Sequence, residues 1–183
     1  TAQVLSEGIA FVSEDRLGVG LLLDESLDWN IAFTAMQAKN KYLKKYLGGL
    51  ITLRDEKAMK ALADDYIKML KIRCTGSQQK ARELSGGNQQ KVVIAKWLLR
   101  KPRVIILDEP TRGIDVGAKY EIYQLIINMA KAGKTIIVVS SEMPEILGIT
   151  NRIAVMSNYR LAGIVDTATT DQEALLRLSA RYL

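Results

Sequence analysis

Apolar residues follow two different spacings along this chain of 183 residues. Between residues 54 and 72, Met59, Leu62, Tyr66 and Met69 recur at three-to-four spacing, which predicts one buried stripe on a charged helix. Val104–Leu107 and Ile136–Val139 are instead apolar runs without alternation, as expected for strands buried on both faces of a parallel sheet. The pattern therefore predicts an α/β fold with helices covering the sheet.

The remaining pattern predicts further elements on either side of these runs. Strands are expected at 8–13, 153–156 and 161–165, and helices at 26–38, 116–132 and 170–182, with another helix starting at residue 85. We find no internal repeat and no linker, so the helical stretch is predicted to be an insertion into one domain.

Composition and charge change this picture little. Hydrophobic residues make up 48% of the chain and charged residues 25%, a balance that allows a real core. The net charge of +6 and the lysines at 39, 41, 44 and 45 allow a nucleic-acid partner, but a solvated loop or helix face is the favoured explanation for them. Because aromatic residues are not interleaved in the pattern of single-strand readers, we expect no nucleic-acid partner.

Targeting signals are not recognisable in the sequence. No apolar run approaches the roughly 20 residues that span a bilayer, and no charged-then-apolar leader opens the chain. The single cysteine, Cys74, has no internal partner for a disulfide. The sequence therefore predicts a cytoplasmic protein.

The first chemical signal is an apolar strand that ends in two acids, Asp108 and Glu109, followed by Pro110. The carboxyl end of a buried parallel strand lies at the sheet edge where nucleotide phosphates and Mg²⁺ bind in P-loop folds. Asp108 would then lie near the magnesium ion, and Glu109 would accept a proton from the water that attacks the γ-phosphate. The alternative is a surface acid pair before a turn.

The second signal is Ser85-Gly86-Gly87-Asn88 before a helix. Ser85 suits the N-cap position, and the two glycines leave backbone N–H groups uncovered at the positive end of the helix dipole. This arrangement suits a phosphate. An ordinary capped helix is the simpler alternative, but the strand with Asp108 and Glu109 begins fewer than about twenty residues later, which favours the phosphate.

These segments resemble the motifs of ABC ATPases. Leu84–Gly87 resembles the signature motif, Ile105–Pro110 the Walker B strand, Arg112–Asp115 the D-loop with Asp115, and Val12–Glu14 the end of the Q-loop strand. The resemblance implies a P-loop NTPase-like parallel sheet with an inserted helical subdomain, and ATP and Mg²⁺ as cofactors.

The resemblance also implies roles for single residues. Glu109 and Ser141 would be catalytic, Asp108 and Glu14 would hold the metal, and Asp115 would belong to the D-loop. The signature residues Ser85, Gly86, Gly87 and Asn88 would contact a nucleotide bound by another ATPase half. The implied divisions are 1–25 for the Q-loop strand and loop, 26–84 for the helical subdomain, and 85–183 for the rest.

Three departures from the family pattern stand out. No Walker A loop precedes the Q-loop strand, and Gly133-Lys134-Thr135 is a poor substitute because Asn128 occupies the required earlier glycine position. The family's switch histidine is replaced by Ser141 in a chain without histidine, and Glu14 and Asn88 stand where glutamine is usual. We therefore expect that the chain lacks the Walker A part, that its own nucleotide site is degenerate, and that the chain alone is inactive.

Within the family, residues 88–91, 108–119 and 140–145 resemble the C-terminal half of double-length ATPases that drive bacterial sugar import. That resemblance implies three partners: an N-terminal ATPase half, membrane permease subunits and, indirectly, a periplasmic sugar-binding protein. It places the protein at the cytoplasmic face of the inner membrane. An ABC ATPase of DNA repair or chromosome maintenance, and a structural dimerisation module, are the alternatives.

The segment Leu22–Gly49 is expected to dock onto the permease, because the family uses the stretch after the Q-loop strand for this contact. Trp29 and Phe33 lie four residues apart and would share one helix face, which suits an apolar anchor. Packing in the core of the helical subdomain is an equally good explanation for both residues.

Overall fold

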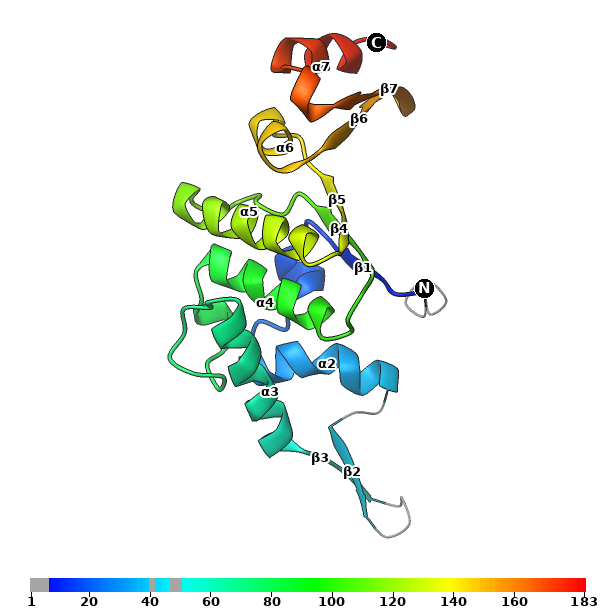
Figure 1. The fold of residues 1–183 in the computed structure, drawn as a ribbon. Helices are drawn as coiled ribbons and strands as arrows, with labels where there is room; N and C mark the ends of the chain where they lie inside the picture. The colour runs from blue at the N-terminus through cyan, green and yellow to red at the C-terminus, as the bar shows by residue number, and fades with distance from the viewer. Residues whose placement is uncertain (1–6, 40–41, 47–50) are drawn as a thin grey trace. The chain divides into compact units, whose positions relative to one another are not determined.

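The computed structural model describes residues 7–39, 42–46 and 51–183. The chain divides into two compact units, Thr1–Ile137 and Val138–Leu183. Figure 1 shows the helices and strands along the chain. Within the described residues, no helix has both the length and the apolar character that crossing a membrane requires.

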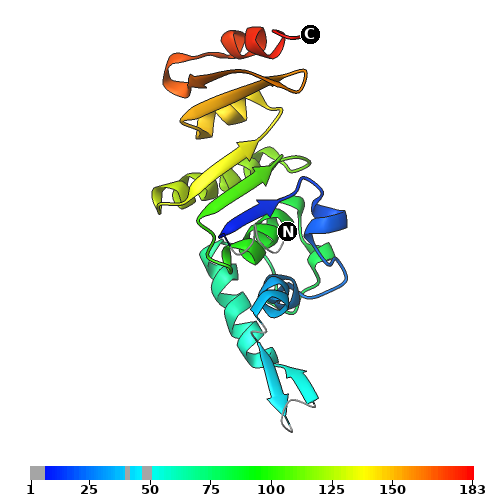
Figure 2. The same ribbon diagram turned by 90° about the vertical axis from the view of Figure 1, so that its right-hand side faces the viewer.

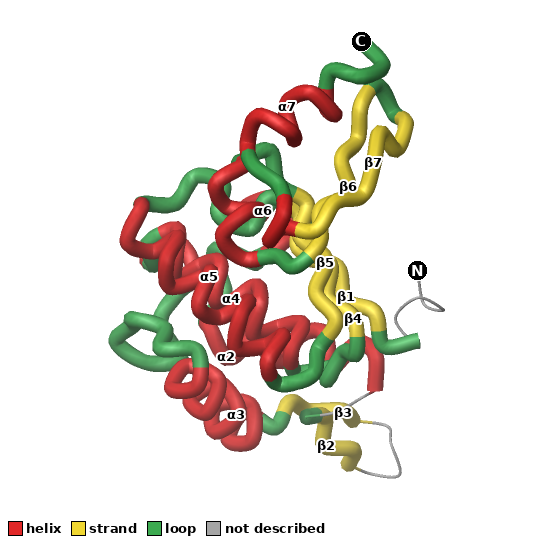
Figure 3. The backbone as a smooth tube through the Cα atoms, turned by 45° about the horizontal axis from the view of Figure 1, so that its top comes forward, coloured by secondary structure: helices red, strands yellow, loops and turns green. Residues whose placement is uncertain are grey.

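The first unit contains a sheet in the order β1-β4-β5, formed by β1 (Ile9–Val12), β4 (Val104–Asp108) and β5 (Thr135–Val139), in which β1 and β4 run parallel. The unit boundary falls within β5. Helix α4 (Gly86–Leu98) packs on β1, and α5 (Val116–Lys131) packs beside α4, as Figure 3 shows. The predicted α/β architecture with a parallel sheet is confirmed.

The expectation that helices cover both faces of this sheet is wrong for the described residues. Ala10 and Val12 of β1 and their partners Ile105 and Leu107 of β4 are buried, whereas Phe11 on the opposite face is 49% exposed. Ile137 of β5 is 47% exposed. Figure 2 shows the three strands side by side. A run of apolar residues indicates that both faces of a strand are apolar, but it does not specify which part of a protein covers each face.

The segment expected to be wholly helical contains a β-hairpin. Helices α2 (Leu27–Lys39) and α3 (Glu56–Met69) pack together, and between them β2 (Leu43–Tyr46) pairs antiparallel with β3 (Ile51–Arg54). The interpretation of the lysine cluster as a loop or helix face is therefore wrong for Lys44 and Lys45, which belong to β2. The signal was two short runs with aromatic and β-branched residues around Gly48-Gly49.

Short helical turns complete the first unit. They are η1 (Arg16–Gly20), in the loop that follows β1, and η3 (Ala81–Glu83), just before α4. The Asp15 side chain accepts a hydrogen bond from the Gly18 amide at 2.8 Å and thereby holds the start of η1. Along the chain, η1 connects β1 to α2 and also contacts α4, whereas η3 leads directly into α4.

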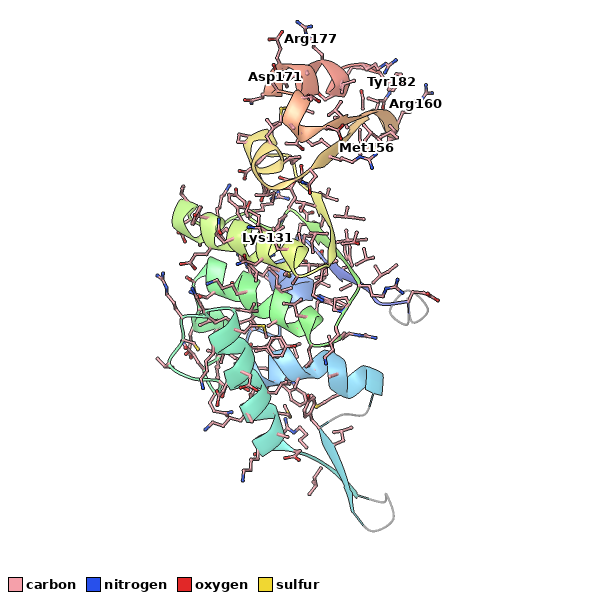
Figure 4. The ribbon with its side chains drawn as sticks, in the orientation of Figure 1. Lys131, Met156, Arg160, Asp171, Arg177 and Tyr182 are labelled. Carbon is pink, nitrogen blue, oxygen red and sulfur yellow. The ribbon has the colours of Figure 1, made fainter. Side chains whose placement is uncertain are left out.

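The second unit is a hairpin covered by two helices. It comprises α6 (Met143–Ile149), β6 (Arg152–Ser157), β7 (Arg160–Asp166), η4 (Thr167–Thr169) and α7 (Gln172–Ser179). Ile153, Val155 and Leu175 form its core. The guanidinium carbon of Arg160 lies 5.9 Å from the centroid of the Tyr182 ring, and Figure 4 labels both residues. The predicted strand pair and final helix are confirmed.

Candidate nucleotide site

The start of α4 presents backbone N–H groups that no side chain of the helix caps. Ser85 occupies the N-cap position with φ −62° and ψ 156°, but its side chain makes no capping hydrogen bond. Instead, its Oγ accepts a hydrogen bond of 2.9 Å from Nδ2 of Asn88. The prediction of Ser85 at the N-cap position is confirmed, while the capping bond itself is absent. The exposed start of this helix suits an anion.

The two glycines of this segment lie in close contact with the residues around the start of α5. A Cβ atom on Gly87 would lie 2.4 Å from Cβ of Ala118 in α5, and a Cβ on Gly86 would lie 3.0 Å from Cγ2 of Ile114. Separations below 3.0 Å are not seen between real side chains, so α4 and α5 reach their present distance only because residue 87 is glycine.

We expect Gly87→Ala to lower the stability of the chain. The added methyl group has to displace the backbone of α5, and overpacking of this kind costs about 1–3 kcal/mol. For a chain of this size the thermal midpoint would fall by roughly 2–12 °C, which circular dichroism measures directly.

Gly117→Ala is the matched control, because it lies in the first turn of α5 and its Cβ would contact only Asp115, at 3.4 Å. This variant should keep or raise the midpoint. Adding Ala118→Gly to Gly87→Ala should recover part of the loss. Equal midpoints for the Gly87 and Gly117 variants would contradict the packing explanation.

A polar cavity of about 170 Å³ opens beside the start of α4. Its walls include Ser85, Gly87 and Asn88 from the signature segment and Asp115 from the loop before α5. The Asp115 carboxylate accepts a hydrogen bond of 2.9 Å from the Ala118 amide and caps α5. The structure thus brings together four of the site residues predicted from the sequence, and Gly86 lies next to them in the chain.

Asp108 and Glu109 lie at the carboxyl end of β4, where the sequence places them. Asp108 ends the strand, and Glu109 follows with a positive φ of 44°. A non-glycine residue in this left-handed region costs on the order of 1–3 kcal/mol and persists where surrounding structure holds it, often at functional sites. The backbone therefore leaves the strand conformation at Glu109, and the separate roles of Asp108 and Glu109 stay predictions.

Glu14 and Asp108 do not by themselves form a metal site. The Glu14 carboxylate makes an ion pair with Arg112, which follows Walker B. Among the described residues, no group of three or more histidine, cysteine or acidic side chains is arranged to hold a metal ion. Proteins often hold Mg²⁺ with only one or two carboxylates together with substrate phosphates, so both residues stay predictions for metal binding.

Ser141, the predicted catalytic residue that replaces the switch histidine, belongs to the second unit. It is exposed in the loop between β5 and α6. Its neighbour Ser140 donates a hydrogen bond to the carboxylate of Glu145, which is buried, and accepts one of 3.0 Å from the Glu142 amide. This local network, which the sequence reading missed, fixes the loop that carries Ser141.

Sequence reasoning also missed three charged residues behind the signature segment. Lys91 lies in α4 with only 4% of its side chain exposed, and its Nζ donates to Oε2 of Glu121 in α5 at 2.8 Å. Arg73, after α3, donates to the other oxygen of Glu121 at 2.9 Å. The hydrogen bond from Lys91 holds the pKa of Glu121 below its ordinary value. A lysine within the helix that otherwise buries Val92, Val93 and Ile94 was the available signal.

Trp29 and Phe33 are partly buried and pack against a core cluster of Ala32, Met36 and Met59. Their ring centroids are 5.9 Å apart, and the guanidinium carbon of Arg54 lies 4.7 Å from the centroid of the Trp29 ring. These contacts favour the core explanation for both residues. Docking of the segment 22–49 onto a permease stays a prediction, and residues 40, 41 and 47–49 of it lie outside the described part.

The sequence of this chain matches a known protein family. The family model described as "ABC transporter" matches residues 4–112. This chain therefore belongs to the ABC transporter family of ATP-binding proteins, as its motifs predicted. It is 60% identical over 174 residues to the galactose/methyl galactoside import ATP-binding protein MglA of Treponema pallidum, with 95% of this chain and 33% of that protein covered.

The MglA protein of Treponema denticola gives the same result, with 56% identity over 181 residues, 99% of this chain and 35% of that protein. The chain thus spans about a third of the length of the curated relatives it matches. Within the sugar importers, Gly163–Asp166 and Leu176-Arg177-Leu178 most resemble the galactose/methyl galactoside type, and these relatives confirm that resemblance. They also favour transport over DNA repair.

Solved structures support the fold. The ATP-binding cassette MJ1267 of an ABC transporter matches with a TM-score of 0.73 and 21% identity, covering 98% of this chain and 68% of that chain. The cbiO1 protein of Clostridium perfringens, part of the ABC transporter complex cbiONQ, matches with a TM-score of 0.71 and 25% identity, covering 96% and 64%. The predicted ABC ATPase fold is confirmed.

Proposed function

We propose that this chain is part of the ATP-hydrolysing, energy-coupling subunit of an ABC importer for galactose or methyl galactosides. Its signature segment contacts a nucleotide that another ATPase half binds. Closure of the two halves on ATP, at the cytoplasmic face of the inner membrane, then drives membrane permease subunits. These permease subunits receive the sugar from a periplasmic sugar-binding protein on the opposite side of the membrane. The names of the MglA relatives support the sugar class.

The observation that carries this proposal is the cavity at the start of α4. Ser85, Gly87 and Asn88 line it at the start of α4, which the Ser85 side chain does not cap, and the D-loop residue Asp115 forms another wall. These groups can bind a phosphate, but the 183 residues contain no G-x-x-x-x-G-K-[ST] sequence to hold the rest of a nucleotide. A signature segment that completes the nucleotide site of another half fits both facts.

The roles of single residues in this proposal follow from their match to the motifs of the family. Glu109 is the general base for the attacking water, and Ser141 hydrogen-bonds the γ-phosphate in place of the family's histidine. Asp108 and Glu14 are the carboxylates for Mg²⁺, which supplies charge neutralisation at the phosphates when bound. Glu14 pairs with Arg112 through Oε2, so the guanidinium and the ion share this carboxylate when the ion is bound.

The isolated chain is expected to hydrolyse no ATP above background and to bind it only at millimolar concentration, because a phosphate loop supplies most of the contacts to the β- and γ-phosphates. A titration with a fluorescent ATP analogue and a phosphate-release assay measure both quantities. Addition of the N-terminal ATPase half should produce turnover. Micromolar ATP affinity or steady turnover by the 183-residue chain alone would overturn the proposal.

A further inference from the structure

The Asn88 side chain connects two segments that are distant in sequence. Its Oδ1 accepts a hydrogen bond of 2.9 Å from the backbone N–H of Arg73, and its Nδ2 donates one of 2.9 Å to Oγ of Ser85. Both ends of the amide are therefore engaged within the chain. An asparagine held in this way has a fixed orientation, since rotation of the amide by 180° would place two donors opposite each other.

The direction of the second bond determines what Ser85 can do. A serine hydroxyl has one hydrogen to donate and two lone pairs to accept with. Because Asn88 donates to the Ser85 oxygen, the hydroxyl hydrogen of Ser85 is left to donate elsewhere, and Ser85 lines the cavity. The walls of the cavity also include Arg73 and the carboxylates Asp115 and Glu121, so an anion there needs every donor that the walls supply, and the Ser85 hydroxyl is one of them.

The charged residues behind Asn88 hold its other partner in place. Arg73 donates through its guanidinium to Glu121, and Glu121 accepts in turn from the buried Lys91, which also donates to the backbone oxygen of Lys71 at 3.0 Å. A buried ammonium group has to remain paired, so these bonds fix the segment from Lys71 to Arg73 against α4 and α5. The backbone N–H of Arg73 is thereby held at the position where Asn88 accepts from it.

We infer that Asn88 is a positioning residue, which makes Ser85 a hydrogen-bond donor toward the phosphate that the signature segment contacts. This inference rests on the proposed function and goes beyond it, because it assigns Asn88 no contact with the nucleotide. Arg73, Glu121 and Lys91 support Asn88 through the backbone of the segment that follows α3.

The test uses the full-length subunit that contains this chain, with ATP as the probe. Asn88→Asp keeps an oxygen that accepts from the Arg73 amide but replaces the donor to Ser85 by an acceptor, so the Ser85 hydroxyl turns toward residue 88. The ATP concentration for half-maximal turnover should rise about ten- to a hundredfold, as expected for loss of a hydrogen bond to a charged group. The thermal midpoint of the Asn88→Asp variant should stay unchanged, because an acidic residue in the first turn of α4 interacts favourably with the helix dipole.

A double-mutant cycle separates positioning from simple repulsion by the new charge. If Asn88 acts through Ser85, Asn88→Asp should change the half-saturating ATP concentration less than about twofold in a Ser85→Ala background. A full additional effect in that background would overturn the inference, because charge repulsion does not need the Ser85 hydroxyl. Failure of the proposed function would look different: Ser85→Ala itself would leave turnover unchanged.

Discussion

Replacement of Ser85 by arginine is expected to lower ATP turnover by the full-length subunit at least about a hundredfold, comparable to the loss of a key transition-state donor. The arginine side chain would fill the cavity of about 170 Å³ and would remove the hydroxyl that faces the phosphate. Steady-state phosphate release at saturating ATP measures the effect. Gly86→Asp should give a similar loss, because its Cβ would lie only 3.0 Å from Cγ2 of Ile114 and 3.3 Å from the Gly113 oxygen, and its carboxylate would repel the phosphate.

Stability provides the control for this result. Ser85 is exposed, so Ser85→Arg should leave the thermal midpoint of the 183-residue chain within about 2 °C of the parent chain. Ser85→Ala, which removes only the hydroxyl, should retain more turnover than Ser85→Arg. Unchanged turnover and sugar transport in the arginine variant would show that the signature segment contacts no nucleotide.

Trp29→Ala is expected to destabilise the chain through its core. Trp29 packs on the cluster of Ala32, Met36 and Met59 and on the ring of Phe33. Truncation of a fully buried tryptophan costs about 3–5 kcal/mol, and a partly buried one about 2 kcal/mol, so the midpoint would fall by about 4–8 °C. Thermal unfolding followed by circular dichroism tests this value.

The same variant decides whether the residue anchors a membrane subunit. Leu22 is a useful comparison, because it lies in the proposed docking segment and is 38% exposed. Leu22→Ser should change the midpoint little and lower crosslinking to the permease if the segment docks there. If Trp29→Ala keeps the parent midpoint while crosslinking is lost, the core explanation fails and Trp29 is the anchor.

Local sequence signals predicted most of the fold. The strand that ends at Asp108, the helix that starts after Ser85 and the strand pair in the second unit all lie where the sequence placed them. Each depends on residues close together in the chain, such as an apolar run before an acid or a serine before glycines. The β2–β3 hairpin was missed because its runs are short and lysine-rich.

Long-range contacts explain the rest of what the sequence did not reveal. The requirement for glycine at position 87 comes from Ala118 in another helix, and the pairing of Lys91 with Glu121 joins α4 to α5. No residue near Gly87 or Lys91 in the sequence indicates that Ala118 or Glu121 is its partner. The sequence identified Ser85 and Asn88 as candidate phosphate contacts, but only the structure shows that Asn88 donates a hydrogen bond to Ser85, on which the proposed division of roles depends.

The exposed apolar face of the β1-β4-β5 sheet affects the colloidal stability of the purified chain. Phe11 and Ile137 present apolar surface there, and β5 is the last strand of the sheet in the described residues. Such a face and edge favour association between molecules, which the net charge of +6 opposes by mutual repulsion. At an ionic strength of 0.15 M, salt limits this repulsion to distances of about 8 Å, but it does not weaken apolar contacts. Colloidal stability of the purified chain therefore declines as ionic strength rises, and dilute, low-salt buffers suit it best.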